Sequence, residues 1–176
     1  RAVTIARECG ADAVSFWSGA APEGLSHAAA MERLVEGCRA VLDRAEAAGV
    51  RLAFEPEPGM FIDTMDRFRE LHDRLDHPLF GLTLDVGHVH CLGDGQIADH
   101  IRGWSERLFN VHLEDMRRGV HDHLMFGEGE MDISGVLAAL ASAGYAGGVH
   151  VELSRHSHNA VETARKAFEY LSTKGC

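Results

Sequence analysis

Short apolar runs alternate with longer amphipathic segments along this chain, and that alternation constrains the fold more than any other feature. The short runs have the length of strands, and the longer segments repeat apolar residues at helical spacing. Because parallel strands must be joined by crossover connections, which are usually helices, such alternation is typical of a parallel sheet. The expected strands are residues 13–17, a run ending at Glu55, a run ending at Asp85, residues 108–113 and residues 148–152. The sequence therefore predicts an α/β fold.

The expected helices have start and stop signals. The longest runs from about Ser26 to Ala48, where Gly49 supplies a stop. Asp63 or Thr64 should cap the next helix, and Asp132 should cap a later one. The remaining expectations are helices at residues 1–9, near 96–104 and from about 159 to 171, a glycine-rich loop after Asp85, and a long loop over residues 114–131.

The length of the chain bears on which parallel fold it adopts. A closed (β/α)8 barrel usually needs about 250 residues, whereas this chain has 176 and begins with Arg1. We expect a single domain, residues 1–176, that is the carboxy-terminal part of a TIM barrel with strands about 3 to 7 or 8, lacking the first two βα units. An open doubly wound sheet is the competing arrangement, but it usually carries a phosphate loop, and neither GxGxxG nor GxxxxGK[ST] occurs here.

Composition excludes several classes of function. The formal charge of -10 argues against a general polyanion binder, so a nucleic acid partner is not expected. The cysteines are widely scattered without CxxC spacing, which favours reduced thiols over a disulfide framework or a structural zinc site. No apolar run approaches the ~20 residues of a membrane span and no signal peptide is visible, so a cytoplasmic location without a membrane partner is the default expectation. Exposed sheet edges would favour association, so a homo-oligomer is an open alternative.

Four of the expected strands end on residues that can bind a metal ion. These residues are Glu55, Asp85, His112 and Glu152. The carboxyl ends of parallel strands meet at one edge of a sheet or barrel, so the four side chains can converge on one point. Each residue alone is more often a helix cap or a loop anchor, but four in this arrangement favour a metal site. Oxygen-rich ligands with a single imidazole suit Mn²⁺, with Mg²⁺, Co²⁺ and Zn²⁺ as competitors.

Five segments of the sequence together resemble the xylose-isomerase-like TIM barrel superfamily. They are residues 52–57, 84–88, 111–115, 126–132 and 150–154, in the same order as in the superfamily and spread over nearly the whole chain. That superfamily includes sugar phosphate isomerases and epimerases, hydroxypyruvate isomerase, inosose dehydratase and the abasic-site endonucleases of the endonuclease IV type. No single segment is specific, but the five together are.

The resemblance implies roles for individual residues. In the ketose epimerase branch the positions of Glu55, Asp85, His112 and Glu152 bind the metal ion, and the positions of His88 and Arg118 hold substrate oxygens. Epimerising a sugar next to a carbonyl requires removal of a C–H proton, and a divalent ion stabilises the resulting enediolate. Glu55 and Glu152 are the expected catalytic carboxylates, one removing the proton and the other returning it.

The segment from His121 to His123 complicates this interpretation. Followed by Gly127 and Gly129, it resembles the Asp-x-His pattern with which endonuclease IV relatives bind extra zinc ions, with His121 in the place of the aspartate. His121 and His123 are therefore candidates for an extra metal site, for groups that support the first ligands, or for polar surface. Against the endonuclease itself, the strand at residues 13–17 ends without a ligand histidine, and the acidic charge suits DNA badly.

Three classes of function remain open at the level of sequence. The first is a metal-dependent isomerase or epimerase acting on a small-molecule carbohydrate, a sugar or sugar phosphate, with an inosose dehydratase-like lyase close to it. The second is an endonuclease IV-like phosphodiesterase acting on abasic DNA. The third is a non-catalytic binding protein that keeps the barrel.

Overall fold

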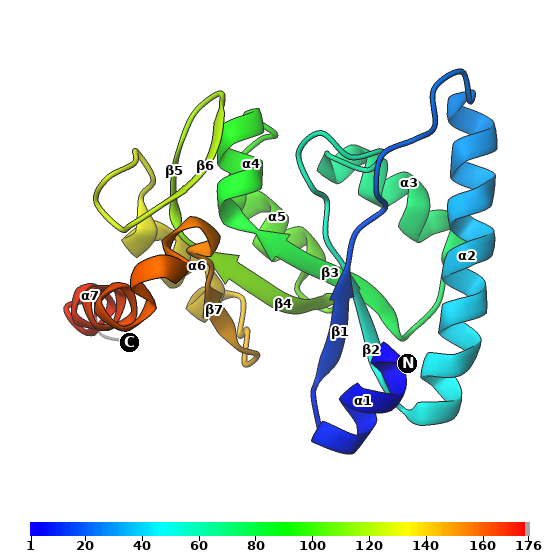
Figure 1. The fold of residues 1–176 in the computed structure, drawn as a ribbon, viewed down its shortest axis with the longest axis horizontal. Helices are drawn as coiled ribbons and strands as arrows, with labels where there is room; N and C mark the ends of the chain where they lie inside the picture. The colour runs from blue at the N-terminus through cyan, green and yellow to red at the C-terminus, as the bar shows by residue number, and fades with distance from the viewer. Residues whose placement is uncertain (175–176) are drawn as a thin grey trace. The chain divides into compact units, whose positions relative to one another are not determined.

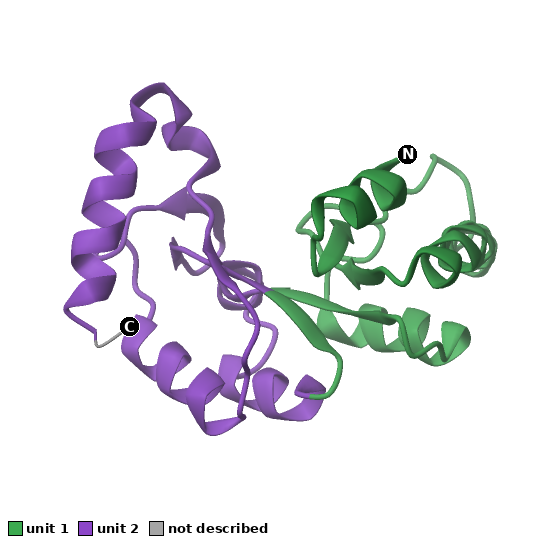
Figure 2. Cartoon of the chain, turned by 90° about the horizontal axis from the view of Figure 1, so that it is seen from below, with its two compact units in different colours: residues 1–84, 106–110 green, residues 85–105, 111–176 purple. Residues whose placement is uncertain are grey.

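The computed structural model describes residues 1–174 of the chain, in two compact units (Figure 2). Unit 1 consists of residues 1–84 and 106–110, and unit 2 consists of residues 85–105 and the chain from residue 111 onward. Strands β3 and β4 contribute residues to both units. Whether the two units make one domain, as the sequence analysis expects, stays a prediction.

The order of elements follows the predicted alternation of strands and helices (Figure 1). The strands of the main sheet are β1 (Ala13–Phe16), β2 (Arg51–Phe54), β3 (Phe80–Asp85), β4 (Leu108–Leu113) and β7 (Val149–Val151). They lie in the order β1-β2-β3-β4-β7, and the pairs β1–β2, β2–β3 and β4–β7 are parallel. Neighbouring strands that follow one another along the chain are typical of a TIM barrel. The predicted α/β fold is confirmed.

The predicted helices are also present. They are α1 (Ala2–Cys9), α2 (His27–Ala48), α3 (Met65–Leu75), α5 (Ile97–Trp104), α6 (Ile133–Ser142) and α7 (Ala160–Ser172). The Ser26 hydroxyl accepts the Ala29 N–H at the start of α2, and the Asp132 carboxylate accepts the Gly135 N–H at the start of α6. Thr64, rather than Asp63, caps α3.

The sequence prediction was wrong just after Asp85, where a helix stands in place of the expected loop. This helix, α4 (Val86–Leu92), begins because an Asp85 oxygen accepts the His88 backbone N–H at 2.9 Å. It ends at Gly93, whose φ of 67° is left-handed. Asp85 therefore ends a strand and caps a helix at once.

The expected loop at residues 114–131 is only partly a loop. It contains the antiparallel hairpin of β5 (Asp115–Arg117) and β6 (Val120–Leu124), with Gly119 at a φ of 75° in the turn. A 3-10 helix, η1 (Ser154–Asn159), also precedes α7 and was not expected. Short strands and 3-10 turns carry too few residues for a periodic pattern to reveal them.

A cluster of aromatic rings holds α3 against the strands of unit 1. Phe54 on β2, Phe80 on β3 and Phe68 on α3 are fully buried, and the ring of Phe68 stacks on the other two with centroid separations of 6.0 and 6.1 Å. Burial of each such ring contributes about 1.5–3 kcal/mol to folding. Because side chains alternate across a strand, the residues that flank Phe54 face away from this cluster.

The buried carboxylate of Asp115 organises the glycine-rich loop of unit 2. Its oxygens accept backbone N–H groups from Met116 at 2.9 Å, Gly127 at 2.8 Å and Met131 at 3.0 Å. A Cβ at Gly129 would fall 2.2 Å from the Asp115 carboxylate, so a larger residue there would collide with it. The motif at residues 126–132 is thus held by Asp115.

Among the described residues, Cys9, Cys38 and Cys91 are free thiols, as expected, whereas Cys176 lies outside them. No helix within residues 1–174 combines the length and hydropathy that crossing a bilayer requires.

Replacing Asp115 with alanine should lower the free energy of unfolding by about 3 kcal/mol, because one buried and two partly buried N–H groups would lose their acceptor. Urea unfolding followed by circular dichroism measures the change. Glu128→Ala, at an exposed position in the same loop, is the matched control and should change stability little. Equal stabilities for the two variants would contradict the anchoring role of Asp115.

Cys38 should resist alkylation in the folded protein. Burial raises the pKa of its thiol to about 12, whereas Cys9 is exposed. Since the thiolate is the reactive species, iodoacetamide at pH 8 should modify Cys38 at least about a hundredfold more slowly than Cys9. Peptide mass spectrometry measures both rates, and the difference should vanish in urea. Similar rates in the folded state would contradict the burial of Cys38.

Candidate metal centre

Three of the four expected metal ligands lie together in unit 2. Asp85 ends β3, His112 lies in β4, and Glu152 directly follows β7, where its N–H donates to the carbonyl of Leu113. The Nδ1 atom of His112 lies 2.7 Å from Oε2 of Glu152 and 3.9 Å from Oδ2 of Asp85. Asp85 is buried, while the other two side chains are partly accessible.

The donor set fits a divalent cation. Carboxylate oxygens and imidazole nitrogens bind such ions at about 2.0–2.2 Å. Ligand atoms on one ion therefore lie about 3–4 Å apart, close to the separations observed here. Small side-chain shifts could accommodate the ion, and no backbone movement in unit 2 is required.

The charge state of Glu152 suits both metal binding and proton transfer. The hydrogen bond from His112 holds the pKa of Glu152 below its usual range, against the opposing effect of partial burial. Glu152 is therefore a carboxylate at neutral pH, and its side chain keeps about a third of its surface accessible, 34%. An ionised, reachable carboxylate can bind an ion or take a proton from a substrate.

Glu55, the fourth expected ligand, belongs to unit 1. It directly follows β2, is 5% exposed, and donates its N–H to the carbonyl of Phe16 at 2.9 Å. Glu55 directly follows Phe54, and successive side chains along a strand point to opposite faces of the sheet. Glu55 therefore faces away from the side of Phe54. Two residues earlier, the carbonyl oxygen of Ala53 accepts the Thr83 hydroxyl. The position of Glu55 is the carboxyl end of its strand, as predicted.

His88, His121 and His123 form an imidazole cluster in unit 2. The Nε2 atoms of His88 and His121 lie 3.1 Å apart, and the rings of His121 and His123 have centroids 5.1 Å apart. Nε2 of His88 also lies 3.5 Å from Oδ2 of Asp85. Burial, followed by the charges of His123 and Arg155, lowers the pKa of His121, so this ring is neutral at physiological pH.

Arg118, the expected substrate clamp, is exposed and lies beside Gly93 at the C-terminal end of α4. A Cβ built on Gly93 would fall 2.6 Å from one of its guanidinium nitrogens. A different arginine reaches the imidazole cluster. Arg155 in η1 donates to the carbonyl of His121 at 3.3 Å and pairs with Asp122 at 3.2 Å. Arg155 was not among the residues predicted from the sequence, although it lies only three residues after the candidate ligand Glu152.

Glu114 is the second functional candidate that sequence reasoning missed. It is fully buried, and its Oε1 accepts the Gly87 N–H at 2.9 Å. Burial and then the nearby Asp85 carboxylate raise the pKa of Glu114 well above its usual range. The signal was its position two residues after His112, because residues at that spacing on a strand share a face.

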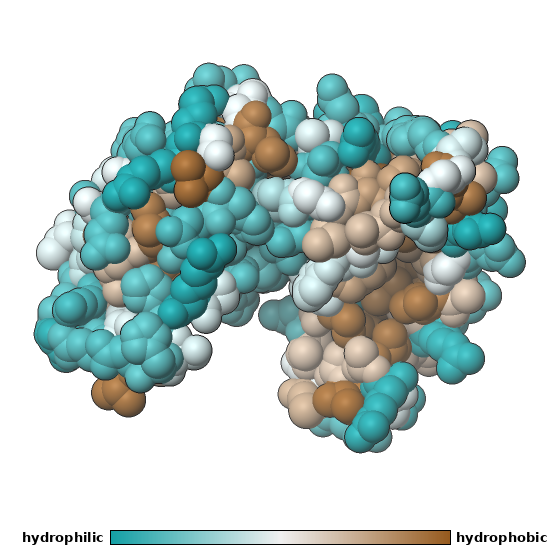
Figure 3. Space-filling view, turned by 45° about the horizontal axis from the view of Figure 1, so that its top comes forward, coloured by the Kyte–Doolittle hydropathy of each residue, from teal (hydrophilic) through white to brown (hydrophobic). Residues whose placement is uncertain are grey.

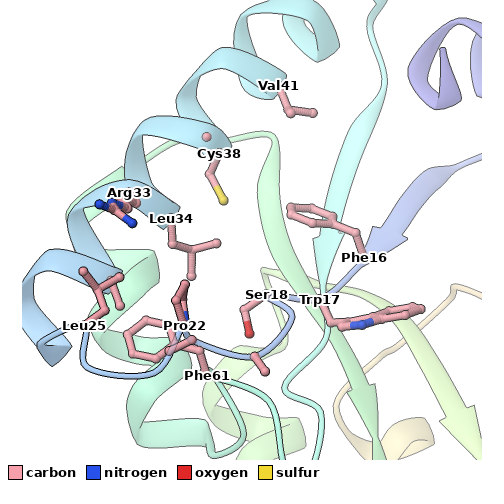
Figure 4. A pocket seen from close by; sticks show the side chains of 14 residues that line it. Phe16, Trp17, Ser18, Pro22, Leu25, Arg33, Leu34, Cys38, Val41 and Phe61 are labelled. Carbon is pink, nitrogen blue, oxygen red and sulfur yellow. The ribbon is translucent and has the colours of Figure 1, made fainter.

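Unit 1 contains an apolar cavity of about 420 Å³. It is lined by Phe16, Trp17, Leu34 and Phe61 among others (Figure 4). Apolar side chains also gather around a hollow on the part of the chain that holds β1 (Figure 3). Trp17 is 56% exposed, so it is not a core residue of this unit.

The sequence is similar to those of a curated dehydratase and a curated epimerase. The chain is 27% identical to the 3-dehydroshikimate dehydratase of Pseudomonas putida over 97% of the chain and 28% of that protein. It is 25% identical to the L-ribulose-5-phosphate 3-epimerase UlaE of Salmonella paratyphi C over 81% of the chain and 50% of that protein. The chain thus spans half or less of the length of these curated relatives.

Solved structures show the same fold. The structure of the IOLI protein with a bound zinc atom superposes with a TM-score of 0.81 at 21% identity, over 98% of this chain and 66% of that one. A family model described as the xylose isomerase-like TIM barrel matches residues 1–174. The chain belongs to the xylose isomerase-like TIM barrel family.

Proposed function

We propose that this chain carries the active site of a metal-dependent isomerase or epimerase of a sugar or sugar phosphate. The observation that carries the proposal is the convergence of Asp85, His112 and Glu152 at the ends of β3, β4 and β7. Side chains at the carboxyl ends of barrel strands are where enzymes of this fold do their chemistry. The similarity to an L-ribulose-5-phosphate 3-epimerase supports a carbohydrate substrate.

We propose Glu55 as the fourth ligand. The residue before it, Phe54, pairs with Leu82 on β3, the strand that ends at Asp85. Two adjacent parallel strands thus each end on a carboxylate, which supports a shared ligand role. The resulting set of three carboxylates and one imidazole suits Mn²⁺, with Mg²⁺, Co²⁺ and Zn²⁺ as alternatives, and the zinc atom in the IOLI protein supports a divalent ion.

The side chains suggest how the proton moves. The bound ion would supply a positive charge that stabilises the enediolate of the substrate. The ionised Glu152 takes the proton from the carbon next to the carbonyl, and the electron pair of that C–H bond forms the carbon–carbon double bond. Glu55 then returns a proton to the other face of that carbon, the electron pair of the double bond forms the new C–H bond, and the carbonyl re-forms with the configuration of that carbon inverted. His88 donates a hydrogen bond to a substrate oxygen, and Arg118 remains the proposed clamp for a hydroxyl or a phosphate.

A dehydratase is the second candidate, and the similarity to 3-dehydroshikimate dehydratase favours it. The first step is the same proton removal, after which the C–O bond on the adjacent carbon breaks, its electron pair leaves with the oxygen, and an acid supplies the proton that makes the leaving group water. Inosose dehydratase-like chemistry belongs to this candidate. The net charge of -10 speaks against abasic DNA as the substrate. A small carbohydrate in the cytoplasm, without a membrane or nucleic acid partner, remains our proposal.

Glu152→Gln should abolish proton exchange. The amide cannot accept the proton, so solvent deuterium incorporation into a panel of ketoses and ketose phosphates should fall by about 10²–10⁴-fold. Proton NMR in D₂O measures the deuterium incorporation. The sample is the chain supplied with Mn²⁺ and expressed together with any flanking sequence that its gene encodes. Glu36→Gln, on the exposed side of α2, is the control. Deuterated substrate indicates an epimerase or isomerase, and a dehydrated product indicates the second candidate. Full turnover by Glu152→Gln would exclude the proposed role.

A further inference from the structure

Arg155 lies beside the candidate metal centre without belonging to it. It is part of η1, the 3-10 helix that begins two residues after Glu152. Its guanidinium donates to the carbonyl of His121 at 3.3 Å, and Nε2 of His121 lies 3.1 Å from Nε2 of His88. The same atom of His88 lies 3.5 Å from Oδ2 of Asp85, a candidate ligand. A chain of contacts within unit 2 therefore leads from Arg155 to the metal centre.

The charges of Arg155 and Glu152 both act on the ring of His121. After burial and the charge of His123, the guanidinium of Arg155 is the next cause that lowers the pKa of His121. The carboxylate of Glu152 raises the same pKa. Because such effects weaken with distance, the two charges lie near one imidazole. A substrate that gives up a proton to Glu152 is therefore close to a positive charge.

Arg155 is held in place and is still accessible. Its Nη2 donates to the carbonyl of His121, and its Nη1 lies 3.2 Å from Oδ1 of Asp122, so both contacts are made to β6. The side chain nevertheless keeps 65% of its surface exposed. A guanidinium has five N–H groups, so two contacts with the protein leave donors for a ligand. An arginine oriented by one strand in this way is suited to bind two oxygens of one anion.

The ion pair with Asp122 does not prevent such binding. The Asp122 side chain is 37% exposed, and ion pairs between exposed side chains are weak because water screens both charges. A phosphate or carboxylate that accepts two parallel hydrogen bonds from a guanidinium can compete with such a pair. The hydrogen bond to the carbonyl of His121 can keep the guanidinium in place when the ligand replaces Asp122.

We propose that Arg155 binds an anionic oxygen group of the substrate, a phosphate or a carboxylate, and thereby selects charged sugars over neutral ones. The inference rests on the proposed function and deepens it, because it names the class of substrate. Arg118 is the competing arginine, but its guanidinium lies beside Gly93, where the carbonyl groups at the end of α4 favour a cation. The anionic group therefore goes to Arg155, and a hydroxyl remains for Arg118.

Binding and exchange measurements on three ketoses test the inference. They are D-fructose, which is neutral, D-fructose 6-phosphate and the carboxylate 5-keto-D-gluconate. The protein is expressed with any flanking sequence that its gene encodes and is loaded with Mn²⁺. Calorimetric titration gives the affinities, and proton NMR in D₂O gives the deuterium incorporation. We expect at least one charged ketose to bind the wild type about 10- to 100-fold more tightly than fructose, and the one that does so identifies the anion.

Variants of the ion pair should change this preference in opposite directions. Arg155→Ala should remove it and change the affinity for fructose little. Arg155→Lys should keep part of it, because an ammonium retains the charge but not the paired hydrogen bonds. Asp122→Asn should raise the affinity for the charged ketose about two- to fivefold, since the guanidinium loses a competing anion. A purely structural role of Arg155 would not produce this increase. Arg165→Ala, which removes an exposed, ion-paired arginine of α7, is the matched control and should equal the wild type.

The outcomes separate this inference from the proposed function. Wild-type protein that binds neither charged ketose more tightly than fructose would overturn the inference, whatever its exchange activity. A preference that survives in Arg155→Ala would also overturn it, and its loss in Arg118→Ala alone would move the anion to Arg118. A preference that Arg155→Ala removes, in a protein that exchanges no deuterium with any of the ketoses, would support the anion site and contradict the proposed proton transfer.

Discussion

The burial of Asp85 beside Glu114 is the constraint on which unit 2 depends. Two carboxylates in a poorly solvated interior repel each other unless a proton or a cation lies between them. The surrounding chain holds them together despite this cost, because Asp85 caps α4 and Gly87 within that helix donates to Glu114. The end of β3 and the first turn of α4 therefore hold two acidic groups close together, and burial and the Asp85 carboxylate raise the pKa of Glu114.

The contact between His112 and Glu152 shifts the pKa of the Glu152 carboxylate in the direction opposite to that of Glu114. The imidazole lowers the pKa of Glu152, whereas burial raises the pKa of Glu114. One unit thus contains a partly accessible carboxylate that is ionised at neutral pH and a buried one whose pKa is raised. Environments that push the pKa values of neighbouring acids apart are how active sites assign roles to identical functional groups. This division supports the proposed role of Glu152 as the base.

The main strands and the candidate ligands at their carboxyl ends could be predicted from the sequence, because both follow simple periodic rules. Each of these strand-like runs leads to an acidic residue, which located Asp85 at the end of β3 and Glu55 and Glu152 directly after β2 and β7. Caps with a local hydrogen-bond pattern, such as Ser26 and Asp132, were predictable for the same reason.

The sequence could not show features that depend on contacts between distant segments. Helix α4 follows its strand without a loop, and its cap is a residue that reads equally well as a metal ligand. Glu114 resembles an ordinary strand-end acid until its oxygens are placed against Gly87. Arg118 was assigned from the resemblance to the ketose epimerase branch, and its guanidinium lies beside Gly93 at the end of α4.

Anomalous diffraction at the manganese edge, from crystals grown with Mn²⁺, is the most direct test of a metal centre at these strand ends. The account predicts an anomalous peak within about 2.3 Å of the carboxylates of Asp85 and Glu152 and of Nδ1 of His112, with the His112–Glu152 hydrogen bond replaced by bonds to the ion. Crystals at saturating Mn²⁺ that keep this hydrogen bond and show no peak among the three side chains would contradict it.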